Sequence, residues 1–137
     1  MTSLDARAIV DRMFAVEMAF LTSNEKDIRQ LAKAFADDVV VREPASLPYG
    51  GDWRGLDGIA RLFDRMNDVW SNMDLKELHV TGAPDRIHLS CTLTMVARST
   101  GKSITQPFCE FLRFQDGRLA EGIPFYYDTK ELLDIIA

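Results

Sequence analysis

Glu110 is an ionisable residue inside a segment whose other residues predict a β-strand, residues 107–114. With the two-residue period of a strand, Glu110 shares one face with Phe108, Leu112 and Phe114. The opposite face carries a cysteine and a phenylalanine, so neither orientation clearly places the carboxyl group in water. Burying a carboxylate is costly unless it is neutralised or paired. Glu110 therefore indicates a polar group inside a pocket, or a structural carboxyl that pairs with an arginine or lies at an exposed edge.

Glu17 is a second acidic residue in apolar surroundings. It lies in a predicted helix, and its neighbours at helical distances of −7, −4, −3, +3 and +4 are all apolar: Val10, Met13, Phe14, Phe20 and Leu21. A carboxyl group in the middle of an apolar stripe is expected either to line a pocket or to meet a partner arginine at a contact between subunits. The pattern is compatible with both.

The histidines and cysteines do not have the spacing of a metal site. His79 and His88 lie in separate predicted strands, and Cys91 and Cys109 form no ligand pair. We therefore expect no metal and no disulfide, with both cysteines reduced. His88 alternates with a serine and two threonines, so it belongs to a polar stripe that either is exposed or lines a cavity and hydrogen-bonds a ligand.

Composition favours one globular domain over residues 1–137. Hydrophobic residues make up 47% of the chain and charged residues 27%, which is ordinary for a soluble protein. A net charge of −5 argues against nucleic acid or an anionic membrane as the main partner. The apolar stretches are far shorter than the roughly 20 residues of a spanning helix. The N-terminal residues lack the pattern of a signal peptide, so we expect a cytoplasmic protein.

The first half of the chain has the periodicity of helices. We predict, in chain order, a helix at 9–21, a second at 27–36, a short β-branched strand at 39–41 and a third helix after Gly55. The segment 44–53 holds two prolines and two glycines and is expected to be a loop. Tyr49 and Trp53 lie in this loop, where they could cover a cavity and contact a ligand.

The second half has the pattern of strands separated by turns. We predict four strands and a closing helical turn, at 75–81, 86–98, 103–115, 118–127 and 130–136. Helices followed by antiparallel strands define the α+β class. A curved antiparallel sheet wrapped around the N-terminal helices would be cone-shaped and leave a central pocket. Because many strand residues are apolar on both faces, the outer face is expected to form a homodimer interface.

Four segments resemble known motifs. Residues 35–44 resemble the first-strand signature of one group in the NTF2-like superfamily. This group comprises ketosteroid isomerase-like proteins and SnoaL-like polyketide cyclases. Residues 54–59 resemble the junction into the third helix, 111–119 the penultimate hairpin and 124–128 the last strand. The resemblance covers nearly the whole chain and implies the cone-shaped NTF2-like (cystatin-like) fold. This fold serves many chemistries, so it does not by itself define one activity.

The resemblance also implies roles for two carboxyl groups. In ketosteroid isomerases an aspartate just before the proline of the first strand is the general base, and Glu43 occupies this place. A second acid, kept protonated in an apolar site, donates a hydrogen bond to the enolate oxygen, and Glu110 lies at the same interval before the hairpin. Those enzymes also have a site tyrosine on their first helix. The corresponding residue here is Ala19, so this tyrosine is not matched. Tyr127 could supply the missing phenol.

The resulting hypothesis is an isomerase or cyclase that acts on a hydrophobic small molecule without cofactor or metal. Glu43 would remove a proton next to a carbonyl group and Glu110 would stabilise the enolate. The expected ligand-binding residues are Glu17, Tyr49, Trp53, His88, Phe125 and Tyr127. The alternative is a dimeric module that binds a ligand without chemistry, and a protein–protein scaffold comes third.

Overall fold

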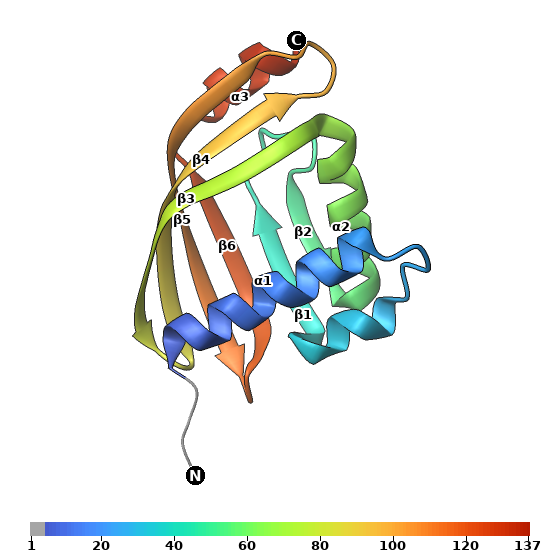
Figure 1. The fold of residues 1–137 in the computed structure, drawn as a ribbon, viewed down its shortest axis with the longest axis vertical. Helices are drawn as coiled ribbons and strands as arrows, with labels where there is room; N and C mark the ends of the chain where they lie inside the picture. Colours follow the sequence, from blue (N-terminus) through green and yellow to red (C-terminus); the bar gives the residue numbers. More distant parts are fainter. Residues whose placement is uncertain (1–4) are drawn as a thin grey trace.

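The computed structural model describes residues 5–137 (Figure 1). Its helical elements are α1 (Ala6–Thr22), the 3₁₀ helix η1 (Ile28–Lys33), α2 (Gly55–Val69) and α3 (Thr129–Ile136). Its strands are β1 (Phe35–Glu43), β2 (Gly51–Arg54), β3 (Trp70–Ala83), β4 (Arg86–Ala97), β5 (Ser103–Gln115) and β6 (Arg118–Tyr126). None of the helices in the described range is long and apolar enough to cross a membrane.

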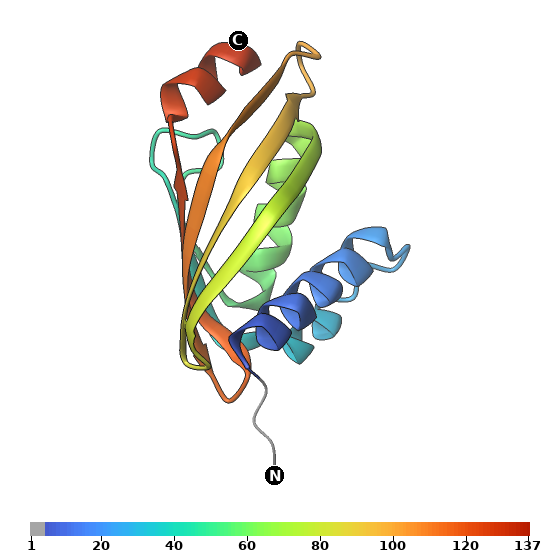
Figure 2. The ribbon, with the colours of Figure 1, turned by 60° about the vertical axis from the view of Figure 1, so that its left-hand side comes forward.

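The six strands form one curved sheet in the order β2-β1-β6-β5-β4-β3. Neighbouring strands are antiparallel except β1 and β6, which are parallel. Because β3 to β6 follow one another as hairpins, the last strand returns beside the first. Helices α1 and α2 lie on the same side of the sheet, as the rotated view shows (Figure 2). The predicted α+β class and the curved sheet around N-terminal helices are confirmed, with one parallel pair in a mostly antiparallel sheet.

The second predicted helix is shorter than expected. The segment forms a 3₁₀ helix over Ile28–Lys33 instead of an α-helix to residue 36. The backbone N–H of Ala34 donates to the Leu31 carbonyl, and the Ala34 carbonyl accepts from the N–H of Leu119 in β6 at 2.7 Å. The chain therefore joins the sheet at Phe35, and β1 is longer than the predicted strand at 39–41.

An aromatic cluster ties the helices to the sheet. Phe63 of α2 contacts Phe20 of α1 and Phe35 of β1, with ring centroids 6.3 Å apart in each pair. Ile59 and Leu62, on the same face of α2, are also buried. This packing holds α1 and α2 against the inner face of the sheet and fixes the distance between them.

The sheet has an apolar inner face and a mixed outer face. Along β4, alternate residues are buried on the side of the helices: Ile87, Leu89, Cys91, Leu93, Met95 and Ala97. The residues between them, including His88, point to the other side. Strand β5 continues this pattern, with Phe108, Glu110, Leu112 and Phe114 on the inner face. Glu110 is thereby placed on the concave side, within the fold.

Candidate functional site: an acidic cavity on the concave face

A cavity of about 500 Å³ lies between α1, α2 and the inner face of the sheet. Its polar floor consists of Glu43, Glu110 and the hydroxyl of Tyr126, and Glu17 faces it from α1. Most of the remaining lining is apolar and includes the aromatic residues Phe14, Phe35, Phe63, Trp70 and Phe108. Among the described lining residues none is basic. The cavity therefore combines three carboxyl groups with apolar walls.

Strand pairing brings Glu43 and Glu110 to the same floor. Glu110 of β5 is opposite Pro124 of β6. Val41 of β1 is opposite Gly122 of β6, and Glu43 and Pro124 each follow two residues later in these parallel strands. The two carboxyl groups therefore project from strands on either side of β6, with backbones about 9–10 Å apart at the usual strand spacing. Residues 67 apart in sequence become neighbours in one site.

Gly122 provides the room for the Glu110 side chain. A β-carbon at position 122 would lie 3.3 Å from Oε2 of Glu110, which is tighter than ordinary van der Waals contact. Gly122 is on the inner face of β6, directly opposite Leu112. The absence of a side chain at this position lets the Glu110 carboxyl group lie against the β6 backbone. The residue pattern of this strand gives no signal for the requirement at position 122.

A series of hydrogen bonds ends on Glu43. The indole Nε1–H of Trp70 donates to the Tyr49 hydroxyl at 2.8 Å, and the hydroxyl oxygens of Tyr49 and Tyr126 are 3.0 Å apart. Tyr126 in turn hydrogen-bonds the Glu43 carboxyl group. With Trp70 donating at one end, each hydroxyl can accept from the preceding group and donate to the next. The series then supplies a donor to Glu43, which favours its ionised form.

The aromatic residues predicted from the sequence take different places. Tyr49 is 1% exposed and lies beneath the floor as part of the hydrogen-bond series, not over the cavity. Trp53 is half-buried and donates from Nε1 to the Tyr49 carbonyl at 2.9 Å, which fixes the loop. Tyr127 is 72% exposed and outside the cavity, so its neighbour Tyr126 provides the phenol.

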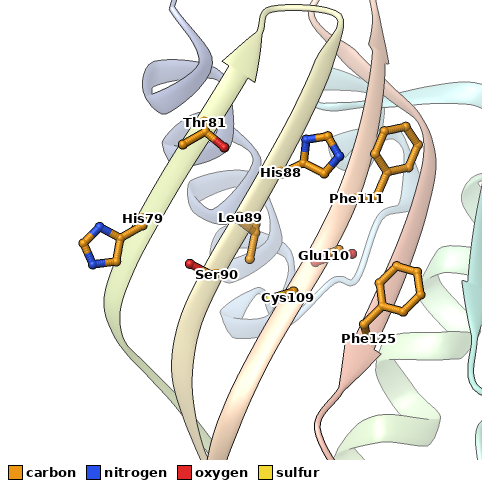
Figure 3. Close-up of a pocket in the computed structure, with 9 residues that line it drawn as sticks. All are labelled: His79, Thr81, His88, Leu89, Ser90, Cys109, Glu110, Phe111 and Phe125. Atoms are coloured by element: carbon orange, nitrogen blue, oxygen red, sulfur yellow. The ribbon is translucent and has the colours of Figure 1, made fainter.

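His88 and Phe125 are on the outer face of the sheet. A hollow of about 230 Å³ lies there, and it is lined by these two residues and by His79, Thr81, Leu89, Ser90, Cys109, Glu110 and Phe111. Figure 3 views this face, with the helices behind the sheet. The His88 and Phe111 rings contact each other, with centroids 5.2 Å apart. His88 and Phe125 therefore do not reach the acidic cavity, and their predicted role as ligand contacts in it is not supported.

Burial raises the pKa values of all three carboxyl groups to neutral pH or above. Burial raises the pKa of Glu43 to about 8 and that of Glu17 to about 8, and the nearby Glu110 adds to both shifts. Burial also raises the pKa of Glu110, to about 7. The hydrogen bond from Tyr126 acts in the opposite direction on the pKa of Glu43. Oε1 of Glu43 is buried without a hydrogen-bond partner among the described residues.

The mouth of the cavity is apolar. Met18 and Leu21 of α1 and Leu75 of β3 line the cavity, yet they are 60%, 41% and 39% exposed. Large apolar side chains that are this exposed around one opening are typical of a ligand entrance. An apolar molecule could enter between α1 and β3 and reach the carboxyl groups on the floor.

The fold and the site place the protein in the class of NTF2-like proteins. Residues 10–122 match the SnoaL-like domain family, and the chain belongs to this family. No curated protein is significantly similar to it in sequence.

Solved structures share the fold. An NTF2-like protein of unknown function from Burkholderia pseudomallei is 25% identical, with a TM-score of 0.72 over 93% of this chain and 98% of that one. A candidate polyketide cyclase from Xanthomonas campestris is 22% identical, with a TM-score of 0.71 over 96% and 98%. A protein of ketosteroid isomerase-like fold from Catenulispora acidiphila, in complex with trimethylamine, is 16% identical, with a TM-score of 0.65 over 83% and 84%.

Electrostatic coupling inside the cavity can be measured without a substrate. In Glu110→Gln, the pKa values of Glu17 and Glu43 should both fall below about 8, because one repulsive negative charge is removed. Carboxyl NMR titration of the seven glutamates measures this. In the control Glu25→Gln, which changes an exposed residue, both values should be unchanged. Unchanged pKa values in Glu110→Gln would show that the groups do not interact.

The same pKa shifts predict a pH-dependent stability. Each buried carboxyl group has a pKa above its ordinary value of 4.5, so between pH 5 and 8 the native state binds more protons than the unfolded state. Stability is therefore highest near pH 5 and decreases as the pH rises to 8. We expect Tm to fall by more than about 10 °C over this range, because each of the three groups loses about 2–4 kcal/mol of stabilisation as it ionises.

Thermal unfolding of wild type and Glu43→Gln across this range checks that expectation. The variant should lose part of the slope because one titrating group is removed. The half-buried carboxylates of Asp27 and Glu121, whose pKa values are lowered by Arg29 and Arg42, titrate below this window. A wild-type Tm that rises from pH 5 to 8 would contradict the expected linkage.

Proposed function

We propose that the protein is a cofactor-independent enzyme that moves a proton next to a carbonyl group of a small molecule, in an isomerisation or a cyclisation. The observation that carries this proposal is a pair of carboxyl groups on one floor, the buried Glu43 and the half-buried Glu110, with no basic residue in the described lining. Acid–base chemistry on carbon requires one carboxylate and one neutral acid in an apolar site. The structural relatives described as a polyketide cyclase candidate and as ketosteroid isomerase-like are consistent with this class.

In this mechanism Glu43 is the base. Its carboxylate takes a proton from the carbon next to the carbonyl group, and the electron pair of the broken C–H bond moves to the carbonyl oxygen as an enolate. Protonated Glu110 donates a hydrogen bond to that oxygen. The proton then returns to a different carbon in an isomerisation. In a ring closure the enolate carbon attacks a second carbonyl group, and the oxygen of that group takes the proton back from Glu43. Tyr126, as donor to Glu43, stabilises the carboxylate before the proton is taken.

The protonation states predict a narrow pH optimum. Glu43 must be ionised and its pKa is about 8, whereas Glu110 must be protonated and its pKa is about 7. The productive combination is therefore a minority form whose share is greatest at about pH 7.5, and it declines on both sides. The hydrogen bond from Tyr126 to Glu43 increases that share.

Glu43→Gln tests the base directly. The wild type should catalyse exchange of the acidic C–H protons of a panel of small ketones and β-diketones in D₂O, detected by mass spectrometry. The variant should lose this activity by about 10²–10⁴-fold, the usual contribution of a positioned base. Glu25→Gln is the matched surface control. A folded Glu43→Gln protein that exchanges at the wild-type rate would exclude Glu43 as the base.

The second candidate is a ligand-binding module without chemistry. It is favoured by position 19, where the helix carries an exposed alanine and no phenol. In that case the wild type would bind members of the panel without exchanging their protons, and Glu43→Gln would change affinity alone. The D₂O experiment therefore separates the two functions.

We also propose that the outer face of the sheet joins two copies of the chain. Phe125 is 56% exposed and lies beside Phe111 in the outer hollow. No helix of the described residues covers the sheet at this hollow (Figure 3). An aromatic surface of this kind is typical of a subunit contact. Burying the outer residues of β4, β5 and β6 against a second copy would remove this apolar area from water.

Light scattering after gel filtration measures the subunit contact. We expect the wild type to elute as a dimer and Phe125→Asp to shift towards the monomer, because a carboxylate would be buried at the interface. Ser46→Asp, on an exposed loop away from this face, should stay dimeric. A monomeric wild-type protein at micromolar concentration would overturn the proposed interface.

A further inference from the structure

Glu17 is a half-buried titratable group that lines the cavity and that the proposed proton transfer does not use. It faces the cavity from α1, while Glu43 and Glu110 project from the sheet. No ion pair with Glu17 occurs in residues 5–137. Two carboxyl groups are sufficient for one base and one acid, so the third has no role in that chemistry. A buried carboxyl group that costs stability indicates a ligand group opposite it.

The charge of the cavity restricts what it can bind. Its described lining carries three carboxyl groups and no lysine, arginine or histidine. An anionic ligand would add a further negative charge to groups that already repel one another, whereas a cation would stabilise their ionised forms. Glu43 is 8% exposed and lines the cavity, and its Oε1 is buried without a hydrogen-bond partner among residues 5–137. A cation nearby would offset the cost of this unpaired oxygen when Glu43 ionises.

The walls distinguish an organic cation from a metal ion. In residues 5–137 no group of three or more possible ligand residues has the arrangement of a metal site. The walls instead carry the rings of Phe14, Phe63, Trp70 and Phe108. Aromatic faces attract ammonium groups, and such rings together with carboxylates are the surroundings in which alkylated ammonium ions are bound. A metal ion would need several of the carboxyl oxygens gathered around one point, and the carboxyl groups of residues 5–137 are not arranged in that way.

We propose that the ligand of this cavity carries a protonated or quaternary ammonium group held by Glu17 and the aromatic wall, on an otherwise apolar body. The inference rests on the proposed function in placing a small molecule in this cavity, and it adds the chemical class of that molecule. The apolar body would occupy the mouth beside Met18 and Leu75, which the cavity also includes. A substrate of this class would be a carbonyl compound with a basic nitrogen.

A bound ammonium group would leave the proposed chemistry intact. The ion pair that it forms with ionised Glu17 has no net charge, so the protonation equilibria of Glu43 and Glu110 are preserved. Because burial raises the pKa of Glu17 to about 8, Glu17 is largely protonated in the free protein at neutral pH, and binding of the cation there must release its proton. The facing titratable groups are Glu43 of β1, Glu110 of β5 and Tyr126 of β6, with Cys91 of β4 near Glu110. Affinity for a cation should therefore increase from pH 6 to 8.5.

Two probes of the same shape test the inference. Benzyltrimethylammonium carries a permanent charge, and neopentylbenzene is its uncharged carbon isostere. Binding of each to wild type and to Glu17→Gln is measured at pH 6 and 8.5 by protein-observed NMR. At pH 8.5, we expect Glu17→Gln to weaken binding of the cation about tenfold or more, equivalent to about 1.4 kcal/mol. Binding of the neutral probe should change less than about twofold. In wild type the cation should bind more tightly at the higher pH.

The outcomes separate this inference from the proposed function. Equal effects of Glu17→Gln on both probes, or binding of the neutral probe alone, would overturn the ammonium class. Glu25→Gln serves as the matched control with one carboxyl removed from the surface, and unfolding curves show whether each variant is folded. Neither binding measurement depends on turnover. If Glu43→Gln exchanges protons in D₂O at the wild-type rate while the protein still prefers the cation, the proposed proton transfer is overturned and the ligand class is retained.

Discussion

Three carboxyl groups share an apolar cavity without a basic side chain in its described lining, and this electrostatic constraint determines most of the properties of the site. Each group loses hydration and also raises the proton affinity of a neighbour. The carboxyl groups of the cavity therefore retain protons at neutral pH, and a change in the charge of one group shifts the pKa values of its neighbours. The proposed catalysis, the proposed ligand class and the expected pH dependence of stability all depend on this one balance. An arginine in the wall would remove it by pairing with a carboxylate.

The sheet topology makes this arrangement possible. The parallel pairing of β1 with β6 brings the end of β1 next to the strand that pairs with β5, so the two floor carboxyl groups come from opposite ends of the sequence. Gly122 leaves space for one of them and Tyr126 donates to the other. Both residues belong to β6. This strand is thus the structural centre of the site, although neither proposed catalytic residue lies on it.

The sequence predicted the two unusual carboxyl groups, Glu110 and Glu17, because an acidic residue interrupts an apolar period in each case. It also predicted the fold class and most elements. It could not predict that Tyr126, and not Tyr127, reaches the cavity. Both faces of β6 are apolar, so the alternation does not define which face is inside, and the pairing with β5 decides it. The same ambiguity misplaced Phe125. The 3₁₀ turn at η1 likewise depends on contacts with β6 that are distant in sequence.

Both tryptophans of the chain are bonded to one residue. Trp53 donates to the backbone carbonyl of Tyr49, and Trp70 donates to the Tyr49 hydroxyl. That hydroxyl contacts the hydroxyl of Tyr126, which in turn contacts Glu43. All indole fluorescence of the protein therefore originates at the base of the site. The two tryptophans form a built-in optical reporter, through which ligand entry and proton uptake could be followed in the unlabelled protein as changes in its ultraviolet emission.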